Sequence, residues 1–564
     1  MSNRMPRRVL RAAAVAIVAG LALAGCVGIP SSGGVNVGGA NLGGAIKDNG
    51  QAPFADLPTG PRKNESKDEM LADFMQAANS PENSYDIARK YLTKAAAQHW
   101  NPAASVLIRE GSATQHNGPN DTVNYSVTTK ASIDSTGVYL EQGRQSTQSL
   151  AFTFTKVSGQ WRISSLADGT VVSRSSFTNV FAAQALYFFD PSFKYLVPDV
   201  RWFPNGSTVQ SRIVSALLGG PAAWLQNGVV VSAFPQGVTL ASAVEVGTNA
   251  ATVDLSANVE ATKTIDRQRM LQQLTQSLQN TSAATVPIAM TVRGAPLQGT
   301  ESSGGDALTP VLAVNGSPLI GSGKKFGFAP RLQPIGTLTG EIVALNPSAV
   351  TVARDQASAA ALASDGVYLV SGGKTSLVDS RSGLIAPSID PWGYAWSVPA
   401  ADASSIEAIG ADGVPHPIAS AIPSRSTIVA LAVSHDGTRV LLYLDTPAGP
   451  LLDVAGIVRR AGVPSSLGPL LELPVGTGDP IDATWVDDRS VAALANSDGL
   501  DTVTSYTIGG TSGSPTTTSD AVHIVGGSGL DNLRVLTSTG QVLQLRSSGW
   551  QNTGSTASLL ATQQ

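Results

Sequence analysis

The stretch that decides the fold is TIVALAVSHDGTRVLLYLDTPAGPLLDVAGIV, residues 427–458. Apolar residues alternate with others in its first part, as the burial of one strand face requires. The dipeptide Asp436-Gly437 interrupts the alternation, and a second apolar run begins at Val440. An Asp-Gly pair between two such runs is typical of a hairpin turn. The stretch therefore predicts short antiparallel strands that follow one another.

Four further stretches repeat this pattern loosely, at residues 357–383, 388–418, 480–510 and 520–550. Repeats of this length with several strands in each are typical of a β-propeller. Ser434-His435-Asp436-Gly437 also resembles a turn found in many propeller blades. We expect residues 306–564 to form an all-β propeller, in which the five clear units are joined by one or two more from the region before residue 350.

The preceding segment, residues 186–305, predicts an α+β domain. A helix over 207–219 places Ile213 and Leu217 on one face, and a second over 265–279 places Met270 and Leu274 inward. Between them residues 229–259 predict a hairpin that turns at 247–249, and residues 286–294 predict a closing strand. The motifs LLGGP, FPQG and ATVDLS in this order resemble the GerMN domain of sporulation and germination proteins.

Residues 61–185 predict a second α+β domain. Helical periodicity runs over 67–80 and 84–100, and alternating strands follow at 122–134, 137–143 and 148–164. The dipeptide Ser158-Gly159 marks a hairpin turn in the last stretch. Helices followed by a curved antiparallel sheet resemble the NTF2-like cone. Some such cones hold a ligand or an active site, but no acid–base pair is evident here, so a scaffold or binding role is favoured.

The amino terminus carries the only cysteine, Cys26, behind an arginine-rich leader and the apolar run 12–24. Such a run after a basic leader is typical of a secretory signal. Leu-Ala-Gly-Cys resembles a bacterial lipobox. That resemblance implies a signal peptide over 1–25, cleavage between Gly25 and Cys26, a diacylglycerol on the Cys26 thiol and often an acyl chain on its amine. A plain signal peptide with a buried cysteine is the alternative. Residues 26–60, rich in Gly, Ser and Asn, predict a lipidated terminus and flexible tether.

Metal and catalytic motifs are sparse in this sequence. No two of the five histidines are spaced as metal ligands, and no second cysteine is present for zinc. No nucleophile elbow, Walker loop or dinucleotide fingerprint is present. We therefore predict no cofactor, no metal site and no catalytic residue. His435 is expected to have a structural role in its turn, and Asp254 to form a strand-end turn or cap a helix rather than act as an acid.

One acidic group could suggest calcium. Asp487, Asp488, Asp498 and Asp501 lie close in the sequence, but they lack the regular alternation of an EF-hand loop. A solvated acidic turn is therefore favoured. A net charge of −4 argues against nucleic acid as a partner.

A lipobox, an NTF2-like domain, a GerMN domain and a propeller, in this order, resemble the LpqB family of actinobacterial lipoproteins. The resemblance implies a lipid anchor on the outer face of the cell membrane. It also implies binding to the extracellular part of a sensor histidine kinase of the MtrB type, with effects on envelope homeostasis and division. The alternative is an envelope carbohydrate binder or hydrolase that uses the propeller funnel, which would need converging carboxylates. The sequence leaves the oligomeric state open.

Overall fold

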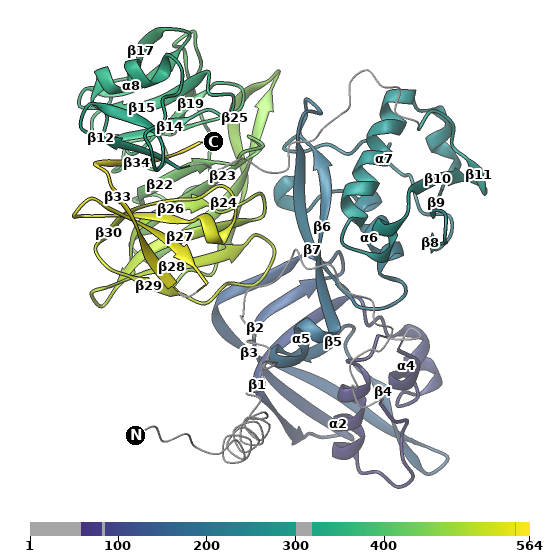
Figure 1. Ribbon diagram of the computed structural model, residues 1–564. Coiled ribbons are helices and arrows are strands. Elements are labelled where there is room, and N and C mark those ends of the chain that lie inside the picture. Colours follow the sequence, from purple (N-terminus) through teal and green to yellow (C-terminus); the bar gives the residue numbers. More distant parts are fainter. Residues whose placement is uncertain (1–57, 82–84, 301–317, 548, 564) are drawn as a thin grey trace, which may run out of the picture. The chain divides into compact units, whose positions relative to one another are not determined.

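The computed structural model describes residues 58–81, 85–300, 318–547 and 549–563, which all belong to one compact unit. The N-terminal part has helices packed on a five-stranded sheet of order β4-β3-β2-β1-β5 (Figure 1). The elements are α2 (Lys67–Ala77), α3 (Asp86–Arg89), α4 (Lys94–His99), β1 (Ser105–Asn117), β2 (Thr122–Asp134), β3 (Tyr139–Val157), β4 (Gln160–Ser165), β5 (Thr170–Ser173) and α5 (Arg174–Val180).

Helix α2 begins with a capping box. The Ser66 hydroxyl accepts from the backbone N–H of Glu69, and the Glu69 carboxylate accepts from the backbone N–H of Ser66. The buried face of the helix includes Leu71 and Phe74, which lie in an aromatic core with Phe152 of β3. Phe152 and Phe154 are both buried, as the predicted alternation requires. The sheet differs from the expected antiparallel one at one edge, because β5 pairs in parallel with β1.

The single helix predicted over 84–100 was wrong. The chain forms α3 and α4 with a break between them, because Leu92 makes a parallel bridge to Ile163 of β4. Thr93 donates its backbone N–H to the Ile163 carbonyl, and its hydroxyl caps α4 by accepting from the N–H of Ala96. Helical periodicity passes through this break unchanged, so it could not reveal the bridge.

The middle part begins with a long two-stranded hairpin that the sequence had not indicated, β6 (Phe181–Phe189) and β7 (Leu196–Pro204). Strand β6 runs through residues 185 and 186, so no loop separates the first two parts of the chain. The remaining elements are α6 (Val209–Gly219), the 3-10 helices η2 (Ala223–Leu225), η3 (Ala257–Ala261) and η4 (Ser282–Thr285), α7 (Thr264–Leu278), and strands β8 (Glu245–Val246), β9 (Ala251–Leu255), β10 (Ile288–Val292) and β11 (Ala295–Pro296).

The predicted inward faces of α6 and α7 are confirmed. Ile213, Leu217, Met270, Leu274 and Leu278 are all buried in one core. The turn predicted at 247–249 joins β8 to β9, where the N–H of Gly247 donates to the Ala250 carbonyl. The closing strand is also present, as β10, which pairs in parallel with β9.

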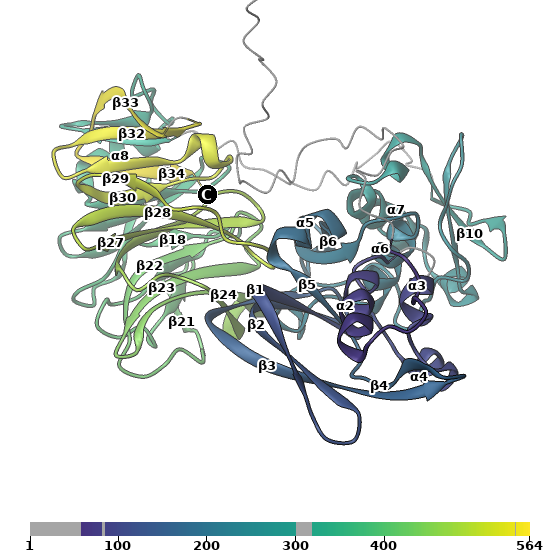
Figure 2. The same ribbon diagram turned by 90° about the horizontal axis from the view of Figure 1, so that it is seen from below.

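Five groups of four consecutive strands follow in the described part of the C-terminal region (Figure 2); the first belongs to a seven-stranded sheet, and each of the other four forms a sheet of its own. They comprise β14 (Ala349–Val352), β15 (Ser358–Ala363), β16 (Gly366–Ser371) and β17 (Lys374–Asp379); β18 (Ser388–Ile389), β19 (Ala395–Ser397), β20 (Glu407–Ile409) and β21 (Pro415–Pro417); β22 (Thr427–Val433), β23 (Arg439–Thr446), β24 (Gly449–Arg460) and β25 (Val463–Leu473); β26 (Asp479–Trp485), β27 (Ser490–Ser497), β28 (Leu500–Thr507) and β29 (Thr516–Thr518); and β30 (Ala521–Val525), β31 (Arg534–Thr537), β32 (Gln541–Arg546) and β33 (Gly549–Thr556), with η5 (Leu530–Asn532).

A sixth group of strands closes the ring. The C-terminal strand β34 (Leu559–Gln563) pairs antiparallel with β12 (Leu319–Ser322), which pairs in turn with β13 (Lys325–Phe328). The end of β34 also bonds in parallel to β14. Helix α8 (Leu338–Leu345) connects β13 to β14. The region before residue 350 therefore supplies strands to the propeller, as expected, and the two ends of the propeller sequence meet in one sheet.

Each of the five repeats predicted from the sequence falls within one of the five groups of four consecutive strands. The four Asp-Gly pairs, which begin at Asp365, Asp412, Asp436 and Asp498, lie in turns between consecutive strands of one sheet. The chain thus combines two α+β parts with an all-β propeller, which is the predicted fold class. None of the described helices is both long and apolar enough to cross a membrane.

Candidate functional site

One end of the propeller axis carries a ring of aspartates. The first strand of each group of four contacts the first strand of the next, so these strands line the axis. Strands β14, β18, β22 and β26 each lead into a turn that contains an aspartate, namely Asp355, Asp390, Asp436 and Asp487. Because these strands run side by side around the axis, the four turns lie at the same end of it. We call this set the rim aspartates.

Asp436 is buried in its turn. It accepts from the Ser434 hydroxyl at 2.8 Å and from the Thr438 N–H at 2.8 Å, and it forms an ion pair with the buried Arg439. Burial alone would raise the pKa of Asp436, but the Arg439 charge and the hydrogen bonds from Thr438 hold that pKa below its usual value. Its carboxylate therefore serves to close the turn.

The other rim aspartates also close their turns. The Asp355 carboxylate accepts a hydrogen bond from the backbone N–H of Ala357 at 2.9 Å, and the Asp487 carboxylate accepts one from the backbone N–H of Arg489 at 2.9 Å. Asp390 accepts from two backbone N–H groups and from the indole N–H of Trp396 at 3.1 Å. Asp390 Oδ2 also forms an ion pair with Arg459 at 2.6 Å. The guanidinium of Arg459 lies 4.1 Å from the centroid of the Trp392 ring, in a cation–π contact. Each of the four carboxylates is thus engaged by hydrogen bonds to its own turn.

Two neighbouring groups have less usual environments. Burial lowers the pKa of His435 to about 4, and neither ring nitrogen has a hydrogen-bond partner among the described residues. Burial also raises the pKa of Asp488 to about 6, with Arg489 at 3.4 Å as its ion-pair partner. The turn placement expected for His435 is as observed. The solvated turn expected around Asp488 is wrong, because its side chain is only 19% exposed.

The structure separates the four aspartates that could have suggested calcium. Asp487 and Asp488 precede β27, whereas Asp498 and Asp501 follow it. A strand of that length keeps its two ends about 20 Å or more apart. Asp501 is itself buried and accepts from the side-chain amide of Asn496 at 2.7 Å. Within the described ranges, no three of His, Cys, Asp and Glu form a group that could hold a metal ion.

The tip of the β6–β7 hairpin lies against this end of the propeller. The ring of Tyr195 meets that of Trp392 edge-on, with 5.9 Å between centroids. Burial raises the pKa of Tyr195; the positive charge of Arg354 opposes this rise, and the negative charge of Asp436 adds to it. Along the same hairpin, burial and then the Asp488 charge raise the pKa of Tyr187 to about 12. Residues of the GerMN-like part thus face the rim aspartates.

A buried ion pair lies at the base of this hairpin. Arg201 and Asp199 are each 2% exposed and form a bidentate ion pair. Arg201 Nε donates to Asp199 Oδ1 at 2.9 Å, and Arg201 Nη2 donates to Asp199 Oδ2 at 2.6 Å. Arg201 also donates to the Thr136 carbonyl in the β2–β3 turn at 2.8 Å. Asp199 accepts from the N–H of Ala222, just beyond α6, at 2.8 Å. The pair therefore joins the N-terminal part to the GerMN-like part.

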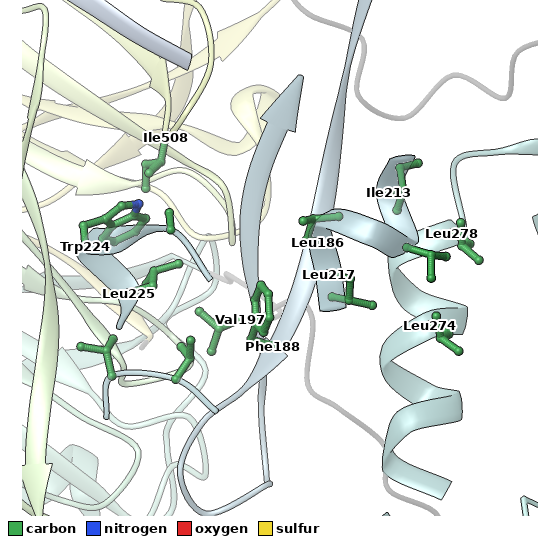
Figure 3. Packing of buried hydrophobic residues seen from close by; sticks show 14 of the residues in the cluster. Leu186, Phe188, Val197, Ile213, Leu217, Trp224, Leu225, Leu274, Leu278 and Ile508 are labelled. Carbon is green, nitrogen blue, oxygen red and sulfur yellow. The ribbon is translucent and has the colours of Figure 1, made fainter. Parts of the chain in front are cut away.

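The next residue extends this junction to the propeller. The indole N–H of Trp202 donates to the Gly509 carbonyl at 2.9 Å. Figure 3 shows the apolar core, with Leu217, Leu274 and Leu278 on the helical side and Trp224 beside Ile508 of the propeller. The sequence analysis missed Asp199, Arg201 and Trp202. The strand pattern LVPDVRWFP could have indicated β7, but not that polar residues within it would be paired.

Asp254 has the structural role that was expected. Its carboxylate accepts from the Thr291 hydroxyl at 2.6 Å and from the N–H of Gly294 at 3.0 Å. These hydrogen bonds, in that order, lower the pKa of Asp254. They fix the β10–β11 turn to the end of β9. Cys26, its cleavage position and the tether up to residue 57 lie outside the described residues.

Three family models match the chain in succession. Residues 60–178 match the N-terminal domain of lipoprotein LpqB, residues 185–298 match the sporulation and spore germination domain, and residues 331–558 match the LpqB β-propeller domain. Together they define a lipoprotein with two α+β domains before a propeller. The chain belongs to the LpqB family.

Curated relatives carry the same family name. The lipoprotein LpqB of Corynebacterium diphtheriae is 34% identical over 200 residues, 34% of this chain, and that of Nocardia farcinica is 32% identical over 217 residues, 38% of this chain. This chain covers only 34% of the length of each of these two relatives. The lipoprotein LpqB of Streptomyces coelicolor is 26% identical over 551 residues, which is 87% of each chain. None of these names is that of an enzyme.

Two solved structures are also similar to parts of the chain. TolB from Acinetobacter baumannii has a TM-score of 0.34 and 13% identity, covering 44% of this chain and 66% of TolB. The first GerMN domain of the sporulation protein GerM from Bacillus subtilis has a TM-score of 0.18 and 24% identity, covering 23% of this chain and 93% of that domain.

Proposed function

We propose that this protein is a non-enzymatic lipoprotein, anchored through Cys26 to the outer face of the cell membrane, that binds the extracellular part of a sensor histidine kinase of the MtrB type and tunes its signalling. The kinase follows from the family resemblance. The observation that supports a binding role is the junction at Arg201 and Trp202, where all three folded parts meet. Such a junction holds the surfaces of the three folded parts in one fixed arrangement, and a protein partner that contacts more than one part needs such an arrangement.

The rim aspartates support binding over hydrolysis. A glycoside hydrolase needs two carboxyl groups that reach the substrate, one as acid and one as base or nucleophile. Here Asp436 and Asp390 are occupied by hydrogen bonds and arginine pairs. The Tyr195 ring lies against the same end of the axis.

The first test uses the full-length lipoprotein and a full-length sensor kinase, reconstituted together in nanodiscs. The lipoprotein should change the rate of kinase autophosphorylation or of phosphotransfer to its response regulator. Crosslinking in intact cells should capture the kinase, and the contact should involve the propeller or the GerMN-like part. An unchanged phosphotransfer rate together with failure to capture the kinase would refute the proposed partner.

The anchor has a separate test. Replacing Cys26 with Ala removes the only thiol, so a clickable fatty acid should no longer label the protein and it should leave the membrane fraction. Stable anchoring takes more than one acyl chain or signal, and both proposed chains depend on this residue. Cys26→Ser is a control that keeps a polar side chain of similar size. A labelled, membrane-bound variant would contradict the assignment.

One observation keeps the hydrolase alternative open to test. Asp488 has a pKa of about 6 beside Asp436, whose pKa is lowered, and carboxyl groups with separated pKa values are a feature of acid–base pairs. Purified protein should nevertheless leave envelope glycans intact. Release of reducing sugars that disappears in Asp488→Asn would favour hydrolysis instead.

A further inference from the structure

A pocket of about 330 Å³ lies on the last four-stranded sheet of the propeller, away from the rim aspartates. Strands β31, β32 and β33 form its floor and walls, and Ala329 and Pro330, just after β13, close one side. Its size is at the lower end of the range for small-molecule sites. Its lining combines polar and apolar surface, and it includes the two cations Arg534 and Arg546.

The strand register places both arginines at this pocket. Arg534 of β31 lies opposite Gln544 of β32, which lies opposite Gln551 of β33. Arg546 follows Gln544 by two residues on the same strand and therefore points to the same face. Diagonal neighbours on paired strands are about 7–8 Å apart, which is within reach of two long side chains that converge on one ligand group.

A buried glutamine positions one of the guanidinium groups. Gln544 is 7% exposed, and its amide oxygen accepts from Arg546 at 3.1 Å. Its amide nitrogen donates to the Asp531 carbonyl at 2.7 Å, which fixes the side chain from the other end. Arg534 donates to the Asn532 carbonyl at 3.0 Å. Each guanidinium is thus oriented by a contact with the described part of the chain, and the contacts found there leave most of its N–H groups available.

The two positive charges lack an acidic partner in the described part of the chain. No carboxylate there lies within ion-pair distance of the half-buried Arg534 or of the exposed Arg546. Burial, and then the charge of Arg546, lower the pKa of Arg534. Two like charges held together gain stability from an anion placed between them.

We propose that this pocket binds a sugar-sized acid, with its carboxylate or phosphate held between Arg534 and Arg546. The planar guanidinium fork matches the paired oxygens of both groups. Amide and hydroxyl groups of Asn552, Thr553 and Ser555 line the rest of the pocket and suit a hydroxylated body. This proposal does not depend on the proposed kinase partner, because it is argued only from the residues that line the pocket.

The test is calorimetric titration of the full-length protein in detergent with four probes: glucuronate, glucose 1-phosphate, glucose and inorganic phosphate. At least one of the two acidic sugars should bind, neutral glucose should not, and the comparison of carboxylate with phosphate identifies the acid. Affinity should fall as salt is raised, because the contact is ionic. Inorganic phosphate should bind more weakly than glucose 1-phosphate.

The variant Arg534→Gln/Arg546→Gln should weaken binding at least about tenfold, since it removes both charge-assisted contacts. Arg460→Gln, at an exposed position of β24, is the matched control and should bind as the parent does. Circular dichroism of the double variant checks that the sheet is folded, and Arg534→Lys/Arg546→Lys, which keeps both charges, should recover part of the affinity.

Three results would overturn the proposal. These are equal binding of the acidic sugar by the parent and a folded double variant, equal binding of glucose and glucuronate, and no binding of either acidic sugar at millimolar concentration. Equal affinity for inorganic phosphate and glucose 1-phosphate, without binding of glucuronate, would show that the pocket takes an adventitious ion only.

Discussion

The propeller contacts the rest of the chain in two ways that differ in character. Toward the GerMN-like part the contact is largely apolar, and Gly456 of β24 lies directly against Val229 and the backbone of Trp224. Toward the N-terminal part it is polar, and Ser512 donates its hydroxyl to Glu141 at 3.1 Å. Apolar burial stabilises in proportion to area, whereas a single polar contact contributes little net free energy. The first contact should therefore dominate.

The largest expected effect is at the ion pair that underlies both contacts. Arg201→Met leaves the Asp199 carboxylate buried without its partner, which costs about 3–5 kcal/mol. Differential scanning calorimetry should show a lowered unfolding midpoint, and the Arg460→Met control should not. The double variant Asp199→Asn/Arg201→Met should recover part of the loss, because no unpaired charge stays buried. Equal midpoints for Arg201→Met and the control would mean that the pair is not buried as described.

The apolar contact is tested by a single added side chain. A Cβ atom at Gly456 would lie 2.6 Å from Val229 and 2.9 Å from the Trp224 carbonyl, so Gly456→Val must push the GerMN-like part away. Overpacking of this kind costs about 1–3 kcal/mol. Limited proteolysis should cut between the two parts sooner. Gly476→Val is the matched control, since its Cβ would meet nothing within 4 Å. Identical digestion of the two variants would argue against the contact.

The polar contact should matter least. Ser512→Ala removes one hydrogen bond, but Glu141 keeps Arg174 at 3.2 Å and Lys130 at 3.7 Å. The expected loss is about 1 kcal/mol, seen as a small fall in the unfolding midpoint. Ser497→Ala, at an exposed position, gives the baseline. A loss as large as that of Gly456→Val would reverse the ranking of the two contacts.

Two histidines make the propeller itself pH-dependent in opposite directions. Burial lowers the pKa of His523, but the ion pair with Asp482 and a hydrogen bond to the Leu560 backbone outweigh burial and raise this pKa above 6.5. The stabilisation that His523 contributes is therefore complete below pH 6.5 and is lost as pH rises through the raised pKa. Burial lowers the pKa of His435 to about 4, so its contribution is present above 6.5 and is lost as pH falls toward 4.

Unfolding midpoints measured across this range should therefore decline on both sides of a maximum. His523→Phe should flatten the alkaline side and His435→Phe the acidic side. A His523→Phe variant whose alkaline decline matches that of the parent would exclude a role for this ion pair in closing the ring near β34.

Local sequence patterns were sufficient for much of the fold. The Asp-Gly turns predicted hairpins because glycine accepts the positive φ that such turns need, and Gly437 and Gly413 both have it. The apolar faces of α6 and α7 followed from helical periodicity, which depends only on residues a few positions apart. The break between α3 and α4 could not be predicted this way, because it depends on Ile163, some seventy positions along the chain.

The same distinction holds for the candidate site. The sequence by itself determined that His435 and Asp436 occupy a strand-to-strand turn and that Asp254 ends a strand, since both follow from neighbours in the chain. Only the tertiary structure decided that Arg201 pairs with Asp199 under Gly220, that Tyr195 lies against Trp392, and that Arg534 and Arg546 share one pocket. The Tyr195–Trp392 contact joins segments far apart in sequence. The energies of the other two depend on burial and charge that exist only after the sheets have closed.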